Sequence, residues 1–148
     1  MGSIEGVIVT PLKIITGASG NVMHAIKNHE PAFQGFGEAY FSTVEPGEVK
    51  GWKKHTRMVL NLIVPAGEIS FVLYDGRKDS PSYDTTWEVS LSLSNYQRLT
   101  VPPGVWMAFK GVGTGLNMLL NIASIPHDPL EAENLPLIND FIPYAGFA

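Results

Sequence analysis

Strict alternation in the segment TTWEVSLSLS, Thr85 to Ser94, is the feature that most limits how this chain can fold. Polar residues fill every second position, and the apolar residues between them are Trp87, Val89, Leu91 and Leu93. Successive side chains of a β-strand point to opposite faces of the sheet. The segment is therefore predicted to be a strand with one buried face and one polar face.

Several other short apolar runs, bounded by glycine and proline, are also predicted to be strands. They are VIVTPLKII (7–15, with a break at Pro11), EAYFSTV (38–44), MVLNLIV (58–64), ISFVLYD (69–75), both sides of the corner in YQRLTVPPGVWMAFKG (96–111), and GLNMLLNIAS (115–124). MVLNLIV and ISFVLYD are expected to pair as a buried hairpin through Pro65 to Gly67. Phe71 and Leu73 should then share one face, opposite Val72 and Tyr74. This series of short strands predicts an all-β sandwich or barrel.

Three segments are less regular. VMHAIKN (22–28) is too short to decide between helix and strand, and IPHDPLEAENLPLINDFIPY (125–144) is expected to be irregular or to form a short final helix. GVGTG (111–115) lacks the lysine and the following helix of a phosphate-binding loop, so it is predicted to be a hairpin turn. Without a repeat or a linker, the chain is expected to be one domain, 1–148, with an irregular tail over 126–148.

Composition excludes several classes of function. The net charge of −4 does not supply the basic surface that a nucleic-acid partner requires. The chain has no cysteine, which excludes disulfides and thiolate metal sites. No apolar run approaches the length of a membrane span, so we expect a cytoplasmic protein with no membrane partner.

Charged residues gather in VKGWKKHTRM, Val49 to Met58, although only 16% of the chain is charged. An extended strand is expected to separate two sets of side chains, Lys50, Lys53, His55 and Arg57 on one side and Trp52, Lys54 and Thr56 on the other. Two interpretations are open. The segment is either a solvated strand edge, protected from pairing by its charge, or one wall of a pocket whose cations hold an anionic ligand.

Five motifs follow one another between about residues 38 and 131. They are KGWKKH (50–55), GEISFVLYDGR (67–77), SPSYDTTW (80–87), LSLSNYQRL (91–99) and VPPGVWMAF (101–109). Their order resembles R-G-L-H, G-E-V with D-V-A-V-D-L-R, S-P-T-x-G-x-W, L-S-x-x-N and I-P-x-G-F-A-H-G-F of the dTDP-4-dehydrorhamnose 3,5-epimerase family. The resemblance implies a cupin, a β jelly roll, that is usually a homodimer.

Members of that family bind a dTDP-linked 4-keto-6-deoxyhexose and invert C3 and C5, with a histidine paired with an aspartate as base and a tyrosine as acid. Along the motifs, Lys53 and Met107 replace two family histidines, and Asn121 falls near the family's tyrosine. The resemblance therefore implies a nucleotide-sugar epimerase or isomerase with altered proton-transfer positions. It implies no cofactor, and the chain lacks the His-x-His pair of metal-binding cupins, so no metal is expected.

Other residues must then carry the proton transfer. His55 lies two positions beyond Lys53, hence on the same strand face, and is the first candidate for the base. Lys53 is the second, because a lysine desolvated beside other cations can act as a base. Asp75 is expected to orient the base. Tyr74 and Tyr144 are candidates for the acid by residue type alone.

Candidate substrate-binding residues come from the cationic segment, the predicted strands and the replaced positions. They are Lys50, Trp52, Arg57, Asn61, Arg77, Trp106, Met107 and Asn121. Several have a structural alternative: Arg77 in an ion pair with Asp75, Asn61 bonded across a sheet, and Trp106 in the core. His127 is expected to be a loop histidine.

Two other functions are open alongside the epimerase. A non-catalytic cupin would bind a sugar or another small molecule after losing the usual histidine and tyrosine. A 3,4-ketoisomerase would share the substrate and the enediol chemistry and return the proton to a different carbon.

Overall fold

The computed structural model describes residues 4–147, which form β-strands and no helix. The strands are β1 (Ile8–Pro11), β2 (Ile14–Ile15), β3 (Val22–Met23), β4 (Glu38–Thr43), β5 (Val49–His55), β6 (Leu60–Ala66), β7 (Glu68–Asp75), β8 (Thr86–Ser92), β9 (Gln97–Val101), β10 (Val105–Gly111), β11 (Met118–Ala123) and β12 (Ala132–Asn134). The predicted all-β class is confirmed. Over the same residues, the search for an apolar helix of membrane-spanning length finds none. The ends of the predicted domain, 1–3 and 148, lie outside the described residues.

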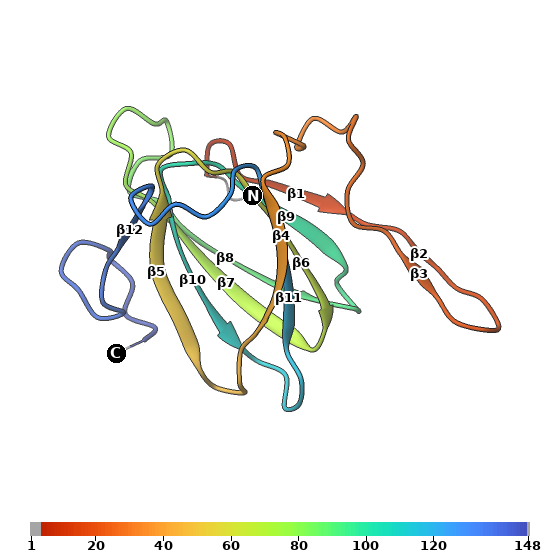
Figure 1. Ribbon diagram of the computed structural model, residues 1–148. Coiled ribbons are helices and arrows are strands. Elements are labelled where there is room, and N and C mark those ends of the chain that lie inside the picture. The colour runs from red at the N-terminus through yellow and green to blue at the C-terminus, as the bar shows by residue number, and fades with distance from the viewer. Residues whose placement is uncertain (1–3, 148) are drawn as a thin grey trace.

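Two antiparallel sheets face each other as a sandwich (Figure 1). The first sheet has the order β1-β9-β6-β11-β4, and the second has the order β12-β5-β10-β7-β8. β2 and β3 form a separate hairpin that projects from the body of the molecule (Figure 1). Consecutive strands often lie in opposite sheets, so the two layers are tied together by the chain itself.

The main core lies between the two sheets, as the alternation predicts. In β7, Phe71 and Leu73 are fully buried in this core, whereas Val72 and Tyr74 pack in a second cluster on the outer face of the second sheet. In β8, Leu91 is fully buried and its alternate neighbours pack against the same core. The predicted faces of both strands are therefore confirmed, except that Leu93, predicted on the buried face, lies beyond the end of β8 and is exposed.

The predicted hairpin between β6 and β7 is wrong, because these strands belong to different sheets. Gly67, between them, has a φ of +78°, and a Cβ there would collide with the backbone of Leu116 and the side chain of Asn117. The tight turn is thus a corner that carries the chain from one sheet to the other. GVGTG (111–115) likewise leads from β10 to β11, in opposite sheets, and is not a hairpin turn.

The C-terminal segment contains a short strand instead of the alternative helix. β12 pairs with the end of β5, with Ala132 opposite His55 and Asn134 opposite Lys53. The irregular chain after β12 then covers the outer face of the second sheet, where Ile142 is buried in the second cluster. VMHAIKN begins with the strand residues of β3 and continues without regular structure.

Candidate active site

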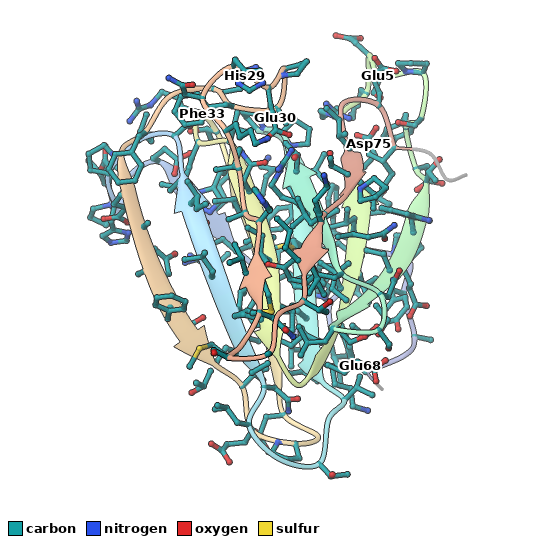
Figure 2. All side chains as sticks on the ribbon, turned by 90° about the vertical axis from the view of Figure 1, so that its right-hand side faces the viewer. Glu5, His29, Glu30, Phe33, Glu68 and Asp75 are labelled. Atoms are coloured by element: carbon teal, nitrogen blue, oxygen red, sulfur yellow. The ribbon has the colours of Figure 1, made fainter. Side chains whose placement is uncertain are left out.

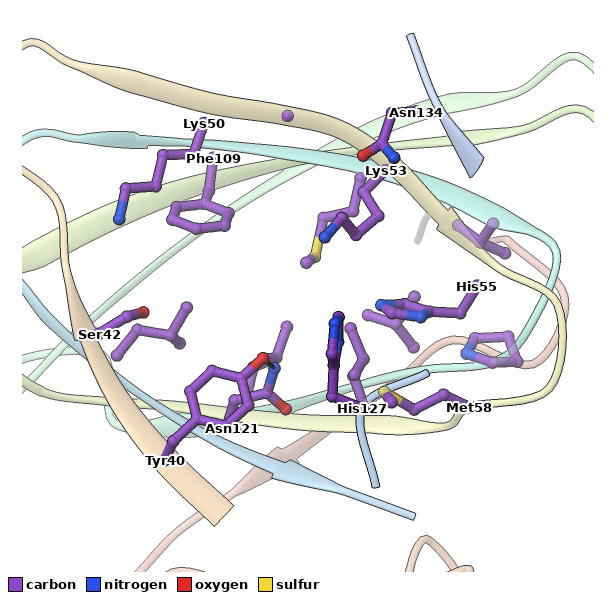
Figure 3. A pocket seen from close by; sticks show the side chains of 18 of the residues that line it. Tyr40, Ser42, Lys50, Lys53, His55, Met58, Phe109, Asn121, His127 and Asn134 are labelled. Atoms are coloured by element: carbon purple, nitrogen blue, oxygen red, sulfur yellow. Dashed lines mark hydrogen bonds between the residues drawn. The ribbon is translucent and has the colours of Figure 1, made fainter. Parts of the chain in front are cut away.

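A cavity of about 290 Å³ opens between the two sheets, beside the main core (Figure 3). β4, β6 and β11 of the first sheet form one wall, and β5 and β10 of the second sheet form the other. Its polar lining side chains are Glu38, Tyr40, Ser42, Lys50, Lys53, His55, Asn121, His127 and Asn134. Its apolar lining comes from Met58, Leu60, Leu62, Val101, Val105, Met107, Phe109 and Leu119.

The cationic segment therefore forms a wall of a cavity, and the solvated-edge interpretation is wrong for its inward side chains. Lys50, Lys53 and His55 all line the pocket. The predicted place of Lys50 on the face of Lys53 does not follow from regular alternation, because an odd number of positions separates the two residues and a regular strand would point them to opposite faces. The pairing of β5 with β10 shifts register between Met107 and Phe109, and this irregularity places Lys50 on the pocket side.

His55 is held by a buried carboxylate. Its Nδ1 lies 2.7 Å from Oε1 of Glu131, whose residue is only 2% exposed. The other oxygen of Glu131 accepts bonds from the backbone N–H groups of Arg57 at 2.8 Å and Met58 at 2.7 Å. A carboxylate can only accept, so Nδ1 carries a proton, and in a neutral ring Nε2 is then the nitrogen that can accept one. The ring itself points into the pocket (Figure 3).

Glu131 is ionised at neutral pH. Burial alone would raise the pKa of its carboxyl, but the bonds from His55 and from the backbone of Arg57 and Met58 lower that pKa to about 2. A fixed negative charge thus stands behind the imidazole. Such a charge orients the ring and stabilises the imidazolium that forms when Nε2 takes up a proton.

Across the pocket from His55, Tyr40 and Asn121 form a polar pair on the first sheet (Figure 3). They are directly opposite each other in the register of β4 and β11, and Nδ2 of Asn121 donates to the Tyr40 hydroxyl at 3.0 Å. Burial raises the pKa of Tyr40, the bond from Asn121 lowers it, and the charge of Glu38 raises it again, leaving the pKa above its usual value. The phenol is therefore protonated at neutral pH.

The two inward lysines occupy different places. Nζ of Lys50 donates to the backbone oxygen of Thr43 at 2.6 Å, which ties β5 to the end of β4 beside the pocket. Lys53 is exposed at the pocket wall beside Asn134 (Figure 3). The burial that a lysine base requires is missing there. The exposure of Lys53 therefore does not favour its predicted role as a base.

Asp75 and Arg77 lie away from the pocket, so the expectation that Asp75 orients the base is wrong. Asp75 is fully buried and accepts from Nε of Arg77 at 2.8 Å and from the hydroxyls of Ser80 and Ser82, each at 2.6 Å. Arg77 also donates to the backbone oxygen of Glu5, at the end of the sandwich where Figure 2 shows Asp75. Asp75 and Arg77 therefore form a structural ion pair, which was the alternative to a role of Arg77 in substrate binding.

Trp52 and Trp106 also differ from their predicted roles. Both are buried in the second cluster, on the outer face of the second sheet, together with Ile142. Trp52 occupies a position of β5 that points opposite to the pocket, and its Nε1 donates to the backbone oxygen of Leu137 at 3.2 Å. These tryptophans anchor the C-terminal segment and do not line the cavity.

Asn61 and Arg57 are placed outside the pocket as well. Asn61 is buried on the outer face of the first sheet, donates to the backbone oxygen of Ala32 at 3.0 Å and accepts from the Thr100 hydroxyl at 2.6 Å. This bonding across the sheet is the structural alternative for Asn61. Arg57 lies after the end of β5 and pairs with Asp128 at 3.2 Å, with 59% of its side chain exposed.

The predicted acids are likewise misplaced. Tyr74 packs in the outer cluster and donates to Asp84 at 2.8 Å, and Tyr144 packs edge-on against Trp52. Of the predicted site residues, Lys50, Lys53, His55, Met107 and Asn121 are brought together in the cavity. His127 belongs to a loop, as expected, and that loop places it in the pocket lining.

Two important residues were missed from the sequence. Tyr40 belongs to a row in which Glu38, Tyr40 and Ser42 alternate along β4, and this period of two was a usable signal for a polar inward face. Glu131 is 76 residues from His55 in an otherwise irregular segment, so no local pattern connects them. Among residues 4–147, no group of three or more His, Cys, Asp or Glu side chains is arranged to hold a metal ion.

The chain is similar to known proteins over most of its length. The crystal structure of a dTDP sugar isomerase from Desulfovibrio desulfuricans G20 is 39% identical, with a TM-score of 0.92, over 96% of this chain and 91% of that chain. A probable low-salt glycan biosynthesis epimerase, Agl13 of Haloferax volcanii, is 26% identical over 130 residues, which is 86% of this chain and 83% of that protein. No protein-family model matches the chain.

A more distant likeness concerns the fold alone. The structure of dTDP-4-dehydrorhamnose 3,5-epimerase from Bacillus anthracis str. Ames is 16% identical, with a TM-score of 0.82, over 94% of this chain and 83% of that chain. This agreement confirms the predicted cupin jelly roll. The 39% identity to the isomerase from D. desulfuricans shows that the chain belongs to the family of cupin-fold dTDP-sugar isomerases and epimerases.

Proposed function

We propose that this protein is a nucleotide-sugar epimerase or isomerase that removes a proton from the carbon next to a keto group. The observation that carries the proposal is the pair of His55 and Glu131: Nδ1 is held at 2.7 Å by an ionised, buried carboxylate, while the ring points into a cavity. A base placed in this way typically contributes about 10² to 10⁴ in rate. The proposed substrate is a dTDP-linked 4-keto-6-deoxyhexose, as the family resemblance implies.

In the proposed first step, Nε2 of His55 bonds to the proton and the electron pair of the C–H bond moves into an enolate. Glu131 does not exchange a proton in this step, because its pKa of about 2 leaves it a weak base. Its charge compensates the imidazolium instead. The lost residues of the family motif are thus replaced, since His55 supplies the base two positions beyond Lys53.

Lys53 and Lys50 supply the positive charge that the enolate and the diphosphate require. Both lie on the pocket side of β5, and ammonium groups form short, strong bonds to phosphate oxygens.

Replacing Lys53 with alanine is expected to weaken pyrophosphate binding about tenfold. Lys54→Ala is the matched control, because Lys54 is on the opposite face of β5, above Trp106 and paired with Glu133. Calorimetric titration of both variants measures the difference.

Tyr40 is the proposed acid. Its phenol is protonated, lines the wall opposite His55 and faces the same cavity. Donation of its proton to the opposite face of the enolate would invert the carbon, leaving a phenolate that solvent reprotonates while His55 releases its proton. Removal and return on opposite faces is the requirement for epimerisation.

An isomerase is the second candidate, because the relative that is 39% identical is described as a dTDP sugar isomerase. The same base and enediol would serve a 3,4-ketoisomerase, in which the proton returns to C4 and the keto group moves to C3. The homodimer and the cytoplasmic location stay predictions from the sequence and its resemblance.

Incubation with dTDP-4-keto-6-deoxyglucose in deuterated water tests the proposal. Deuterium at C3 or C5 with the 4-keto group retained indicates an epimerase, and deuterium at C4 with a 3-keto product indicates the isomerase. Thermal stabilisation by the nucleotide sugar without any deuterium would instead favour the non-catalytic binding cupin. His55→Gln serves as the inactive control.

A further inference from the structure

One histidine of the pocket has no part in the proposed mechanism. His127 belongs to the loop between β11 and β12, is exposed and lines the cavity. Its ring points into the cavity, as the ring of His55 does (Figure 3). Two imidazoles from distant segments of the chain therefore face the same space. A ring N–H of His127 is available there to donate a hydrogen bond to a ligand.

The loop between β11 and β12 is fastened to the segment that follows the proposed base. At its start, Oγ of Ser124 accepts from the N–H of Val59 at 2.8 Å, and the N–H of Ser124 donates to the oxygen of Val59 at 3.0 Å. In its middle, Asp128 pairs with Arg57 at 3.2 Å. At its end, the carboxylate of Glu131 accepts from the N–H of Arg57 at 2.8 Å. These bonds hold the second imidazole at the end of the cavity where the base lies.

A donor at this end of the cavity meets a need of the reaction. Removal of a proton next to a keto group places negative charge on the keto oxygen, which belongs to the carbon beside the one that the base attacks. A donor for that oxygen must therefore stand near the base. Lys50 already donates to the backbone oxygen of Thr43, and an ammonium group acts as a point charge, whereas an imidazole N–H is a directed donor.

We propose that His127 is a further catalytic residue, whose ring N–H donates a hydrogen bond to the oxygen at C4 of the sugar while the enolate forms. The inference rests on the proposed function. The bond is stronger to the charged enolate oxygen than to the neutral keto oxygen, so it acts mainly on the transition state. Its loss should lower kcat about 10- to 100-fold, the range for a hydrogen bond to a charged group, and should change KM much less.

Deuterium exchange into dTDP-4-keto-6-deoxyglucose at saturating substrate tests the inference. His127→Leu should lower the exchange rate at least tenfold and leave the affinity for dTDP, measured by calorimetric titration, unchanged. His127→Gln keeps an N–H donor and should lose less than His127→Leu. His29→Leu is the matched control, because His29 is exposed on a different part of the surface (Figure 2). This variant should exchange at the wild-type rate.

A titration without turnover separates the inference from the proposed function. The wild-type protein should bind dTDP-6-deoxyglucose, which has an oxygen at C4, about 2- to 10-fold more tightly than the 4-deoxy form of that ligand. This is the range for a neutral hydrogen bond. His127→Leu should bind the two ligands equally.

Exchange at the wild-type rate by a folded His127→Leu variant would overturn the inference and leave the proposed function standing. Equal losses in the leucine and glutamine variants would also overturn it, because the N–H would then have no role. A parallel loss of dTDP affinity would do the same by placing His127 at the nucleotide. If the wild-type protein shows no exchange, the proposed proton transfer fails and the titration decides: discrimination at C4 that depends on His127 keeps the contact, and equal affinities reject it.

Discussion

Two buried carboxylates, Asp75 and Glu131, show how similar chemistry serves two different purposes in this fold. Asp75 is 0% exposed and Glu131 is 2% exposed, and hydrogen bonds hold the pKa of each well below its usual range despite burial. They differ in their partners. Asp75 bonds to the guanidinium of Arg77, which cannot give up its proton, whereas Glu131 bonds to the imidazole of His55.

A carboxylate with a lowered pKa therefore marks a functional site only when the group it bonds to is itself part of that site. The partner of Asp75 closes a structural network at one end of the sandwich, with Ser80 and Ser82 completing it. The partner of Glu131 has a second nitrogen that faces a cavity. Structural ion pairs also shift pKa values, so the shift alone does not separate the two cases.

The largest expected effect is on catalysis. Glu131→Gln should lower the rate of deuterium exchange by about 10² to 10⁴, because the ring of His55 loses the charge that fixes its tautomer and stabilises its protonated form. His55→Gln should be about as damaging, and the double variant should be little worse than either single variant. Additive losses in the double variant would show that the two residues do not act as a unit.

Asp75→Asn should show the opposite behaviour, with a loss of stability and little loss of activity. Removing one partner of a buried ion pair leaves an uncompensated group, so the free energy of unfolding should fall by about 3 kcal/mol. Urea titration measures this cost. The exchange rate per folded molecule should stay close to that of the wild-type protein. A loss comparable to that of Glu131→Gln would show that the two carboxylates do not differ in their effect on catalysis.

Glu131 should also make stability depend on pH in acid. Its folded-state pKa is lowered from 4.5 to about 2, so its contribution is complete above about pH 4.5 and is lost as the pH falls through 2. The stability lost over this range is on the order of 3 kcal/mol at most. Urea titrations of the wild-type protein and Glu131→Gln between pH 6 and pH 2, in about half-unit steps, should converge as the pH falls. Parallel curves would contradict the assigned shift.

The smallest effect concerns the hydroxyl bonds to Asp75. Ser80→Ala removes one bond to its carboxylate, which should cost about 1.5 kcal/mol of unfolding free energy. Thermal unfolding detects a change of this size. Activity should be unchanged at temperatures where the variant is folded, and a fall in the exchange rate would connect this network to the pocket after all.

The strand faces were predictable from the sequence because they depend on local alternation. The inward and outward sides of β7 and β8 follow from the period of two, and so does the position of His55 on the face of Lys53. By the same rule, Trp52 belonged to the opposite face from these two residues. Trp52 was a binding candidate as part of the cationic segment, but the C-terminal segment covers its face of the sheet and makes that face a second core.

Long-range pairing was not predictable, because short strands and turns do not specify their partners. A tight turn at Gly67 suits a hairpin or a corner equally, and in the structure it is a corner that packs against Asn117. The pairing of β12 with β5 brings Glu131 to His55, and no sequence motif indicates that pairing. A register shift between β5 and β10 brings Lys50 to the pocket side, and strict alternation does not predict such a shift.

Deuterium exchange into dTDP-4-keto-6-deoxyglucose, followed side by side for the wild-type protein, Asp75→Asn and Glu131→Gln, tests the central claim most directly. The claim is that the carboxylate behind His55, and not the one beside Arg77, sustains proton removal in the pocket. We predict exchange by the wild-type protein and Asp75→Asn, with exchange by Glu131→Gln reduced at least a hundredfold. Full exchange by a folded Glu131→Gln, together with its loss in a folded Asp75→Asn, would contradict the account.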